Sequence, residues 1–374
     1  MVSPSIVFHH PLPVDHEPKV GSTTHVTRML HGFQASGYEV EVVAGHSKDR
    51  VMAMKRVRSD MAKGRHFAFA YAEASTAPTC LNDPDHLPRH PIADWRFLRD
   101  LHRRDVPVGL FYPDVYWRFP LYADAVPFVK RKVASAFYRF DLAWYRRVLD
   151  VMFLPSGRMR LSVPGWVDPD RVVSLAPGGE IDPLPVADRT GEIHLFYVGS
   201  VSPPLYDIRD LVRAVQNVTV SRLTISCPRN EAAVAEQWRS DRIEIVHEHG
   251  PALRKRYQSC DIACLFYAPY SYREFAMPVK LFEAIGYGRP LLANPGTTAA
   301  SFIANADLGW ITEPVELPNL LKRLAADRQL IDRTRASVVH HQADHSWESR
   351  ARFVAETLLA TSGNRPPSPT EPSR

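Results

Sequence analysis

The feature that most limits the fold of this chain is the alternation of short apolar runs with segments of helical periodicity. In the first half, apolar runs at 5–10 and 39–45 flank a helical segment at 21–38, which Gly37 is suited to end. A strand, a helix and a strand at this spacing form a βαβ unit. The sequence therefore predicts a parallel sheet.

The second half shows the same alternation more strictly. Its strand-like runs lie at 193–200, 221–226, 242–248, 261–267 and 290–294, with helical segments between them. This pattern is typical of a doubly wound α/β domain. The length of 374 residues also favours two domains, because a single core stops growing well before this size.

We therefore expect an α/β protein with a first domain at 1–185 and a second at 186–345. A last helix follows at 346–361. The segment 362–374 is poor in apolar residues and rich in proline, so we expect it to be disordered.

The composition is that of an ordinary globular protein. A net charge of +5 is compatible with phosphate-bearing ligands or with an anionic membrane surface, but identifies neither. The four cysteines form no CxxC pair, so we expect buried reduced thiols and no metal site. There is no signal-peptide pattern and no spanning apolar stretch, which predicts a cytoplasmic protein, at most peripheral to a membrane.

The stretch EFAMPVKLFEAIGYGRPLLAN at 274–294 is the strongest candidate site. Pro278 suits the first position of a helix whose free N–H groups and dipole attract anions. Lys280 adds a positive charge there, suited to a diphosphate, and Glu283 shares its face and suits a ribose diol. The alternative is a salt bridge on a solvated helix face. The position after the apolar run 261–267, at the carboxyl edge of a sheet, favours ligand binding.

The pattern P-x-K-x-x-E followed by A-x-G-x-P resembles the donor-site signature of glycosyltransferase family 4. The segments 21–45, 173–182 and 345–354 resemble other parts of that family in the same order. The resemblance implies a GT-B fold, in which two Rossmann-like domains face a cleft and the last helix returns to the first domain. It also implies a nucleotide sugar on the second domain, an acceptor on the first and no metal. Glu283 would then hold the ribose and Lys280 the diphosphate.

The chain departs from this family at two points. Many relatives carry a further glutamate where Phe275 stands, and Glu274 is one residue away; backbone groups of Phe275 to Met277 are the alternative contact. We include Ala276, Pro278 and Val279 in this predicted donor site. At Gly199 and Ser200, relatives often have an arginine after the glycine, and Arg209 is the only cation that the sequence offers nearby.

Further candidates lie in the first domain. Asp114, Tyr116, Trp117 and Arg118 follow a strand and are expected to line an acceptor pocket; the alternative is that the aromatic rings fill the edge of the core. Gly21 and Ser22 belong to the family's first glycine loop.

His9 ends the first strand. With Asp114 and Lys280 it completes our set of candidate catalytic residues, although a structural role is the alternative for any single histidine.

The segment 126–150 combines basic and aromatic residues. Its apolar positions follow helical spacing and predict one buried face, made of Val129, Val133, Phe137, Phe140, Trp144 and Val148. The alternative is contact with an anionic membrane that carries a lipid-linked acceptor.

The function that these features predict is transfer of a sugar from a nucleoside-diphosphate sugar to a saccharide, glycolipid or small-molecule acceptor. The resemblance implies retention of the anomeric configuration, and a setting in polysaccharide biosynthesis follows by analogy only. Two alternatives stay open, a nucleotide-sugar epimerase and a catalytically degenerate scaffold that binds a nucleotide.

Overall fold

The computed structural model describes residues 3–15, 21–165, 168–185 and 191–362. It divides the chain into a first domain, Met1–Ala176 with Trp347–Arg374, and a second domain, Pro177–Ser346. The described residues of each domain form a six-stranded parallel sheet. Two doubly wound Rossmann-like domains, as predicted from the sequence, are therefore confirmed. From residue 363 onward, the predicted tail lies outside the described residues.

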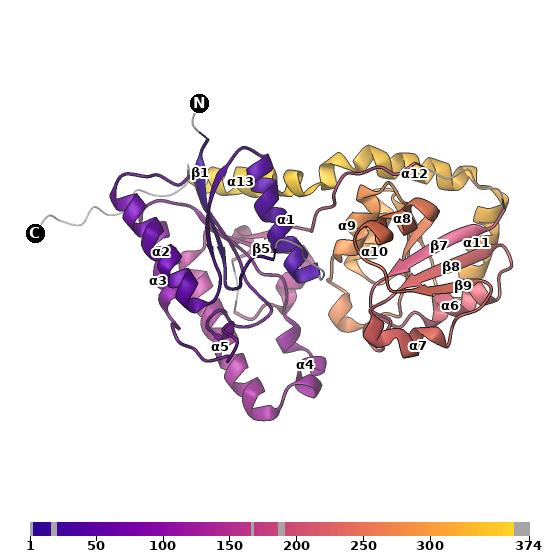
Figure 1. Cartoon of the computed structure of the whole chain (residues 1–374), viewed down its shortest axis with the longest axis horizontal. Coiled ribbons are helices and arrows are strands. Elements are labelled where there is room, and N and C mark those ends of the chain that lie inside the picture. Colours follow the sequence, from indigo (N-terminus) through magenta and orange to yellow (C-terminus); the bar gives the residue numbers. More distant parts are fainter. Residues whose placement is uncertain (1–2, 16–20, 166–167, 186–190, 363–374) are drawn as a thin grey trace, which may run out of the picture. The chain divides into compact units, whose positions relative to one another are not determined.

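The sheet of the first domain has the order β2-β1-β3-β4-β5-β6. Its strands are β1 (Ser5–His10), β2 (Glu39–Ala44), β3 (Ala70–Glu73), β4 (Val108–Phe111), β5 (Val151–Leu154) and β6 (Val172–Ser174). Its helices are α1 (Gly21–Ala35), α2 (Ser47–Ala62), α3 (Ala93–Arg103), α4 (Pro120–Ala125), α5 (Phe128–Val148) and α13 (Trp347–Ser362). The helices α1 and α13 lie side by side on one face, and α2, α3 and α5 cover the other (Figure 1).

The last helix, α13, belongs to the first domain, as the sequence predicted. A side chain at Gly32 of α1 would place its Cβ 2.8 Å from the carbonyl oxygen of Trp347, so the two helices cross in close contact. A Cβ at Gly109 of β4 would meet the Leu358 side chain at 2.8 Å. Because glycine has no side chain at these two positions, α13 packs directly on α1 and on the sheet.

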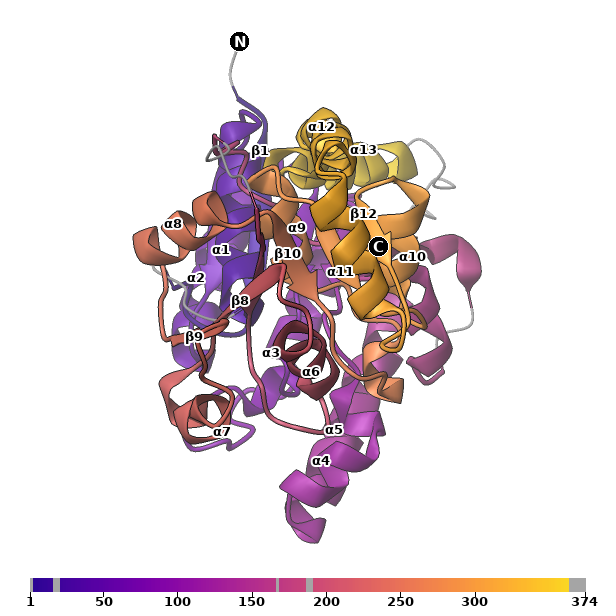
Figure 2. The same cartoon turned by 90° about the vertical axis from the view of Figure 1, so that its right-hand side faces the viewer.

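The sheet of the second domain has the order β12-β11-β10-β7-β8-β9. Its strands are β7 (Ile193–Val198), β8 (Ser221–Ser226), β9 (Ile243–Val246), β10 (Ile262–Leu265), β11 (Leu291–Ala293) and β12 (Gly309–Ile311). Its helices are α6 (Arg209–Gln216), α7 (Ala232–Glu236), α8 (Pro251–Ser259), α9 (Val279–Gly286), α10 (Thr298–Asn305), α11 (Leu317–Ala326) and α12 (Gln329–His341). The helices α6 and α11 are in contact on one face, and α8 and α9 pack on β7 and β10 (Figure 2).

Several elements were not predicted from the sequence. They are α2, β3, α3 and α4 in the first domain and α10, β12, α11 and α12 in the second. The helix α2 shows why: most of its residues are polar, and it buries only a narrow apolar stripe that includes Ala53, Met54 and Val57. Periodicity is a weak signal where so few apolar residues carry it.

The predicted buried face of α5 is wrong at its amino end and right at its carboxyl end. Val129 and Val133 are exposed, whereas Val148 is buried as predicted. The prediction omitted Tyr138 and Tyr145, which are buried, and the Tyr145 ring lies 4.9 Å from the Trp95 ring of α3. A tyrosine ring is apolar and only its hydroxyl needs a partner, so it can face the core.

The boundary between the domains lies at Ala176–Pro177 and not at residue 185. The segment that follows packs against α9 so closely that a Cβ at Gly179 would lie 2.1 Å from the Phe282 carbonyl oxygen. A Cβ at Gly286 would likewise lie 2.1 Å from the Glu180 carbonyl oxygen, and the Asp182 N–H donates to Gly286 O at 3.0 Å. These backbone contacts attach the segment to the second domain.

We predict that Gly286→Ala destabilises the protein by about 1–3 kcal/mol, because backbone on both sides has to move apart to admit the methyl group. Urea denaturation followed by circular dichroism measures the change. Gly157→Ala is the control, since its Cβ would meet only the Ser174 hydroxyl at 3.3 Å. Equal unfolding free energies for the two variants would contradict the prediction.

Candidate functional site

The helix α9 begins at the carboxyl edge of the second sheet, since it connects β10 to β11. Pro278 is the residue before the helix, with φ −72° and ψ 140°, so the helix starts one residue later than predicted. No side chain caps the first turn. Its backbone N–H groups and the positive end of its dipole are therefore available to an anion.

Lys280 and Glu283 form an ion pair on this helix. The Lys280 Nζ lies 2.8 and 3.1 Å from the two carboxylate oxygens of Glu283, and the side chains are 35% and 25% exposed. Both predicted contact residues are thus partly covered yet accessible. A pair of this kind stabilises a helix by only about 0.3–0.5 kcal/mol, so it would not hold Lys280 back from a phosphate.

The segment before α9 alternates between buried and half-buried residues. Arg273, Phe275 and Met277 are buried, whereas Glu274, Ala276, Pro278 and Val279 are partly exposed. The Phe275 ring packs edge-on against Tyr272, at 5.7 Å. The side chain at the position of the relatives' glutamate therefore points into the domain, which leaves the backbone and Glu274 as the available contacts.

The loop after β7 carries the predicted Gly199 and Ser200. Gly199 has φ 148°, a conformation that favours glycine. The Ser200 hydroxyl donates to the carboxylate of Glu231 at 2.7 and 2.9 Å, and the Val201 N–H donates to it at 2.6 Å. Position 200 thus offers no cation. Arg209 does not replace one here, because it is exposed and its Nε donates to Asp207 at 2.8 Å.

Arg273 is a residue that the sequence reasoning missed. Its guanidinium carbon lies 4.4 and 4.6 Å from the ring centres of Tyr206 and Tyr267, and Nη2 donates to the Tyr267 hydroxyl at 2.8 Å. Tyr267 follows β10, which neighbours β7, the first strand of this domain. The strands β8 and β9 follow β7 on one side of the sheet, and β10, β11 and β12 follow on its other side. The strand order therefore reverses between β7 and β10, and ligands of doubly wound sheets bind at such a point. No motif signals this residue, because one of the two rings that hold it, Tyr206, comes from a distant segment.

The first domain gathers histidines at the corresponding edge of its sheet, where β1 neighbours β3. The His9 Nε2 lies 2.7 Å from the Asp94 carboxylate, to which Arg50 also donates at 2.9 Å. His9 is thus engaged in a buried polar network, as the structural alternative supposed. His10 Nδ1 lies 3.1 Å from the Glu73 carbonyl oxygen.

His25 completes this edge. Its Nδ1 lies 3.0 Å from both oxygens of the Glu73 carboxylate, and its ring stacks on Phe111 at 4.1 Å. It also meets the Trp347 ring edge-on at 5.2 Å, which joins α1 to α13. The contacts of His25 therefore serve to hold the domain together at its candidate ligand edge.

The predicted acceptor residues behave differently from one another. The Trp117 ring is buried, stacked on Tyr138 at 4.9 Å, and its Nε1 donates to the Tyr112 hydroxyl at 3.1 Å. It fills the edge of the core, as the alternative proposed.

Asp114 accepts from the Tyr116 N–H at 2.7 Å, which stabilises the turn. Arg118 is exposed. Gly21 and Ser22 lie in the first turn of α1, and their side chains are outside the described residues.

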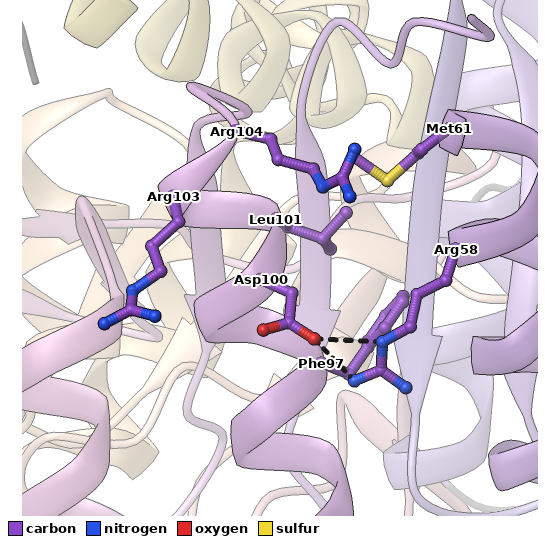
Figure 3. A pocket seen from close by; sticks show the side chains of 7 residues that line it. All are labelled: Arg58, Met61, Phe97, Asp100, Leu101, Arg103 and Arg104. Atoms are coloured by element: carbon purple, nitrogen blue, oxygen red, sulfur yellow. Dashed lines mark hydrogen bonds and ion pairs between the residues drawn. The ribbon is translucent and has the colours of Figure 1, made fainter. Parts of the chain in front are cut away.

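A hollow of about 330 Å³ lies between α2 and α3. Figure 3 shows Arg58 pointing toward Asp100, with Nε 2.9 Å from the carboxylate, while Arg103 and Arg104 stand at the end of α3. Both helices end there, before β3 and β4 begin. The hollow is thus at the amino edge of the sheet, opposite the edge at which doubly wound domains bind ligands.

Cysteines and metal ligands add nothing to the site. All four cysteines are buried and stay outside any disulfide. Within the described residues, no three His, Cys, Asp or Glu side chains come together in a way that could hold a metal ion. Metal-independent donor binding stays a prediction. No helix in the described part of the chain has the length and apolar character that crossing a bilayer requires.

Comparisons with known proteins agree with this arrangement. Residues 207–356, which include α9, match the family model described as glycosyl transferase-like. No curated protein matches the chain in sequence. The structure resembles that of HepE from Anabaena in complex with UDP and glucose, at 12% identity and a TM-score of 0.59, covering 95% of this chain and 99% of that one.

Two further solved structures share the architecture. Sucrose-phosphate synthase from Thermosynechococcus elongatus has 14% identity and a TM-score of 0.61, over 97% of this chain and 100% of that one. WaaG, a glycosyltransferase involved in lipopolysaccharide biosynthesis, has 13% identity and a TM-score of 0.54, over 95% of this chain and 99% of that one.

The fold is therefore that of the GT-B class. The match to the glycosyl transferase-like model covers most of the second domain, and this similarity agrees with the resemblance seen in the sequence.

We predict that His10 makes the stability of the protein depend on pH. Burial lowers the pKa of His10 from 6.5 to about 4. Between these values the unfolded chain binds more protons than the native one, so the free energy of unfolding falls as the pH falls. His10→Asn should reduce the loss of stability between pH 7.5 and 4.5 by about 2–3 kcal/mol.

Urea denaturation at several pH values measures this effect as a difference between variant and wild type. The difference matters because burial raises the pKa of Asp141 to about 7, which contributes a pH dependence of opposite sign. His66→Asn, at an exposed position, is the control. Parallel stability curves for His10→Asn and the wild type would show that the prediction is wrong.

Proposed function

We propose that the protein transfers a sugar from a nucleoside-diphosphate sugar to a saccharide, glycolipid or small-molecule acceptor. The donor binds at the amino end of α9, with its diphosphate at Lys280 and its ribose diol at Glu283. The observation that carries this proposal is the partly exposed Lys280–Glu283 pair beside an uncapped helix start at the carboxyl edge of the sheet. HepE, which shares the fold, was crystallised with UDP-glucose, and this supports a donor of the same chemical class.

In the proposed reaction, donor binding replaces the ion pair of the free protein. Lys280 turns to the diphosphate, and the Glu283 carboxylate is released to accept hydrogen bonds from the ribose hydroxyls. As the bond between sugar and diphosphate breaks, negative charge grows on the leaving group. Lys280 and the helix dipole stabilise that charge. Retention of the anomeric configuration remains an expectation from the family resemblance.

We predict that Glu283→Gln weakens donor binding by about 10- to 100-fold, because hydrogen bonds to a charged group contribute about 1.5–3 kcal/mol. The melting temperature without donor should change little, since the ion pair contributes little to stability. A thermal-shift screen of UDP, GDP, ADP and dTDP sugars selects the donor, and calorimetry then gives its affinity.

Asp332→Asn is the matched control, because Asp332 pairs with Arg335 at 2.9 Å with the same spacing on a helix of the same domain. Full donor affinity in Glu283→Gln would contradict the ribose assignment. Labelled donor with a mixture of acceptors separates transfer from epimerisation. Donor binding without any turnover would instead favour the scaffold alternative.

We further propose that the first domain contacts an anionic membrane through the turn between α4 and α5, which projects from that domain in Figures 1 and 2. Phe128 and Val129 are 63% and 72% exposed there. Arg131 and Lys132 lie 5.6 and 5.4 Å from the Phe128 ring. Apolar side chains surrounded by cations suit the headgroup region of an anionic bilayer.

We predict that the double variant Lys130→Gln, Lys132→Gln binds vesicles of phosphatidylcholine and phosphatidylglycerol about 10- to 30-fold more weakly, at about 1 kcal/mol per cation. Sedimentation with vesicles measures the binding. The control, Arg103→Gln with Arg104→Gln, removes the same charge at the hollow between α2 and α3. Equal binding of both double variants would contradict a specific role for the α4–α5 turn.

A further inference from the structure

We propose that Arg273 supplies the positive charge that the relatives' arginine provides beside the donor diphosphate, from a different element of the same sheet edge. The proposal rests on the proposed function, because it assigns a further residue to the same donor site. It explains how a chain with serine at position 200 can still neutralise two phosphates.

The first argument is the burial of the Arg273 side chain. Only 7% of the residue is exposed, and its Nε is fully buried without a hydrogen-bond partner. Nη2 donates to the Tyr267 hydroxyl, whereas Nη1 has no partner among the described residues and is not fully buried. The guanidinium therefore keeps one nitrogen at the surface and another without an acceptor.

The second argument is the absence of a counter-charge. Within the described residues no carboxylate pairs with Arg273, and the titratable groups that act on it most are the phenols of Tyr197, Tyr206 and Tyr267. Arginine is always protonated in proteins. A buried charge without a partner is costly, so an anion supplied from outside would lower the free energy of this arrangement.

Two other buried arginines show what a purely structural arginine looks like in this protein. Arg50 forms a two-pronged pair with the Asp94 carboxylate, with Nε at 2.9 Å and Nη2 at 3.1 Å. Arg289 donates to the carbonyl oxygens of Tyr257, Leu184 and Pro185 at 2.7, 3.2 and 3.1 Å. Each of these two side chains donates to at least three oxygen atoms. Arg273 has one phenol and two aromatic faces instead.

The third argument is position. Tyr197 lies in β7 and its hydroxyl donates to the Ser200 carbonyl oxygen at 2.5 Å, while Tyr267 follows β10. Arg273 lies in the segment that leads into α9, and its guanidinium packs on the ring of Tyr206, which belongs to the loop after β7 that also carries Ser200. A diphosphate at the start of α9 is an anion of the kind that a planar, fork-shaped guanidinium binds well.

Arg273→Met tests the proposal, because methionine can occupy the space between the rings without a charge. We expect its affinity for the nucleoside diphosphate of the selected donor to fall by about 10- to 100-fold, as when a charged hydrogen bond is lost. Affinity for the corresponding nucleoside, which has no phosphate, should be unchanged. Arg273→Lys should recover part of the lost affinity.

Stability without ligand separates binding from structure. Removing an unpaired buried charge should leave the melting temperature unchanged or raise it. A purely structural arginine predicts the reverse, a lower melting temperature with normal diphosphate affinity, and that result would overturn the proposal. Arg273→Gln serves as a second neutral variant if Arg273→Met does not fold, and normal diphosphate affinity in it would overturn the proposal equally. Arg209→Gln is the control, since its exposed cation already pairs with Asp207.

The same measurements distinguish failure of this inference from failure of the proposed function. Suppose that the wild type binds the diphosphate, that Glu283→Gln weakens this binding and that Arg273→Met does not. In that case only the role of Arg273 is wrong. If the wild type binds no nucleoside diphosphate at all, the donor site itself is wrong and this inference fails with it.

Discussion

The contact between α9 and the backbone of residues 179–180 is the constraint on which the candidate donor site depends. Glycines on both sides allow carbonyl oxygens to approach where any side chain would collide. Gln342 adds two hydrogen bonds from its amide to the carbonyl oxygens of Ile285 and Gly286, at 2.9 and 2.8 Å. These contacts fix the carboxyl end of the helix, so its amino end is held at the sheet edge without a capping side chain that would compete with an anion.

Both domains place polar groups at the edge where the order of their strands reverses. The domains differ in how far these groups are paired with carboxylates. In the first domain the His9 ring contacts the Asp94 carboxylate and the His25 ring contacts the Glu73 carboxylate, so these polar groups are paired within the protein. In the second domain Lys280 is held only by a weak surface pair, and Arg273 has no carboxylate among the described residues. A doubly wound sheet offers a ligand edge in each domain, and this difference in positive charge is the reason we propose the second edge for a diphosphate.

Much of the fold could be predicted, because strands such as Ile193–Val198 and helices such as Val279–Gly286 carry strong local signals of apolarity. The helix α2 could not, since its apolar stripe is narrow. The buried face of α5 was wrongly placed at its amino end, because Tyr138 is buried there while Val129 and Val133 are exposed. In the candidate site, Lys280 and Glu283 were predicted from their spacing and from the family resemblance. Arg273 was not predicted, because its contact with Tyr206, from a distant part of the chain, appears only in the folded structure.

The sequence by itself determined the class of the fold, the order of its elements and the helix at whose start an anion can bind, because these depend on local periodicity and on residues three positions apart. Only the tertiary structure decided which cation stands beside that helix, which histidines are already committed to carboxylates and where the first domain ends. Those properties depend on the burial of charge and on backbone contacts between distant segments, and neither is recorded in the spacing of residues along the chain.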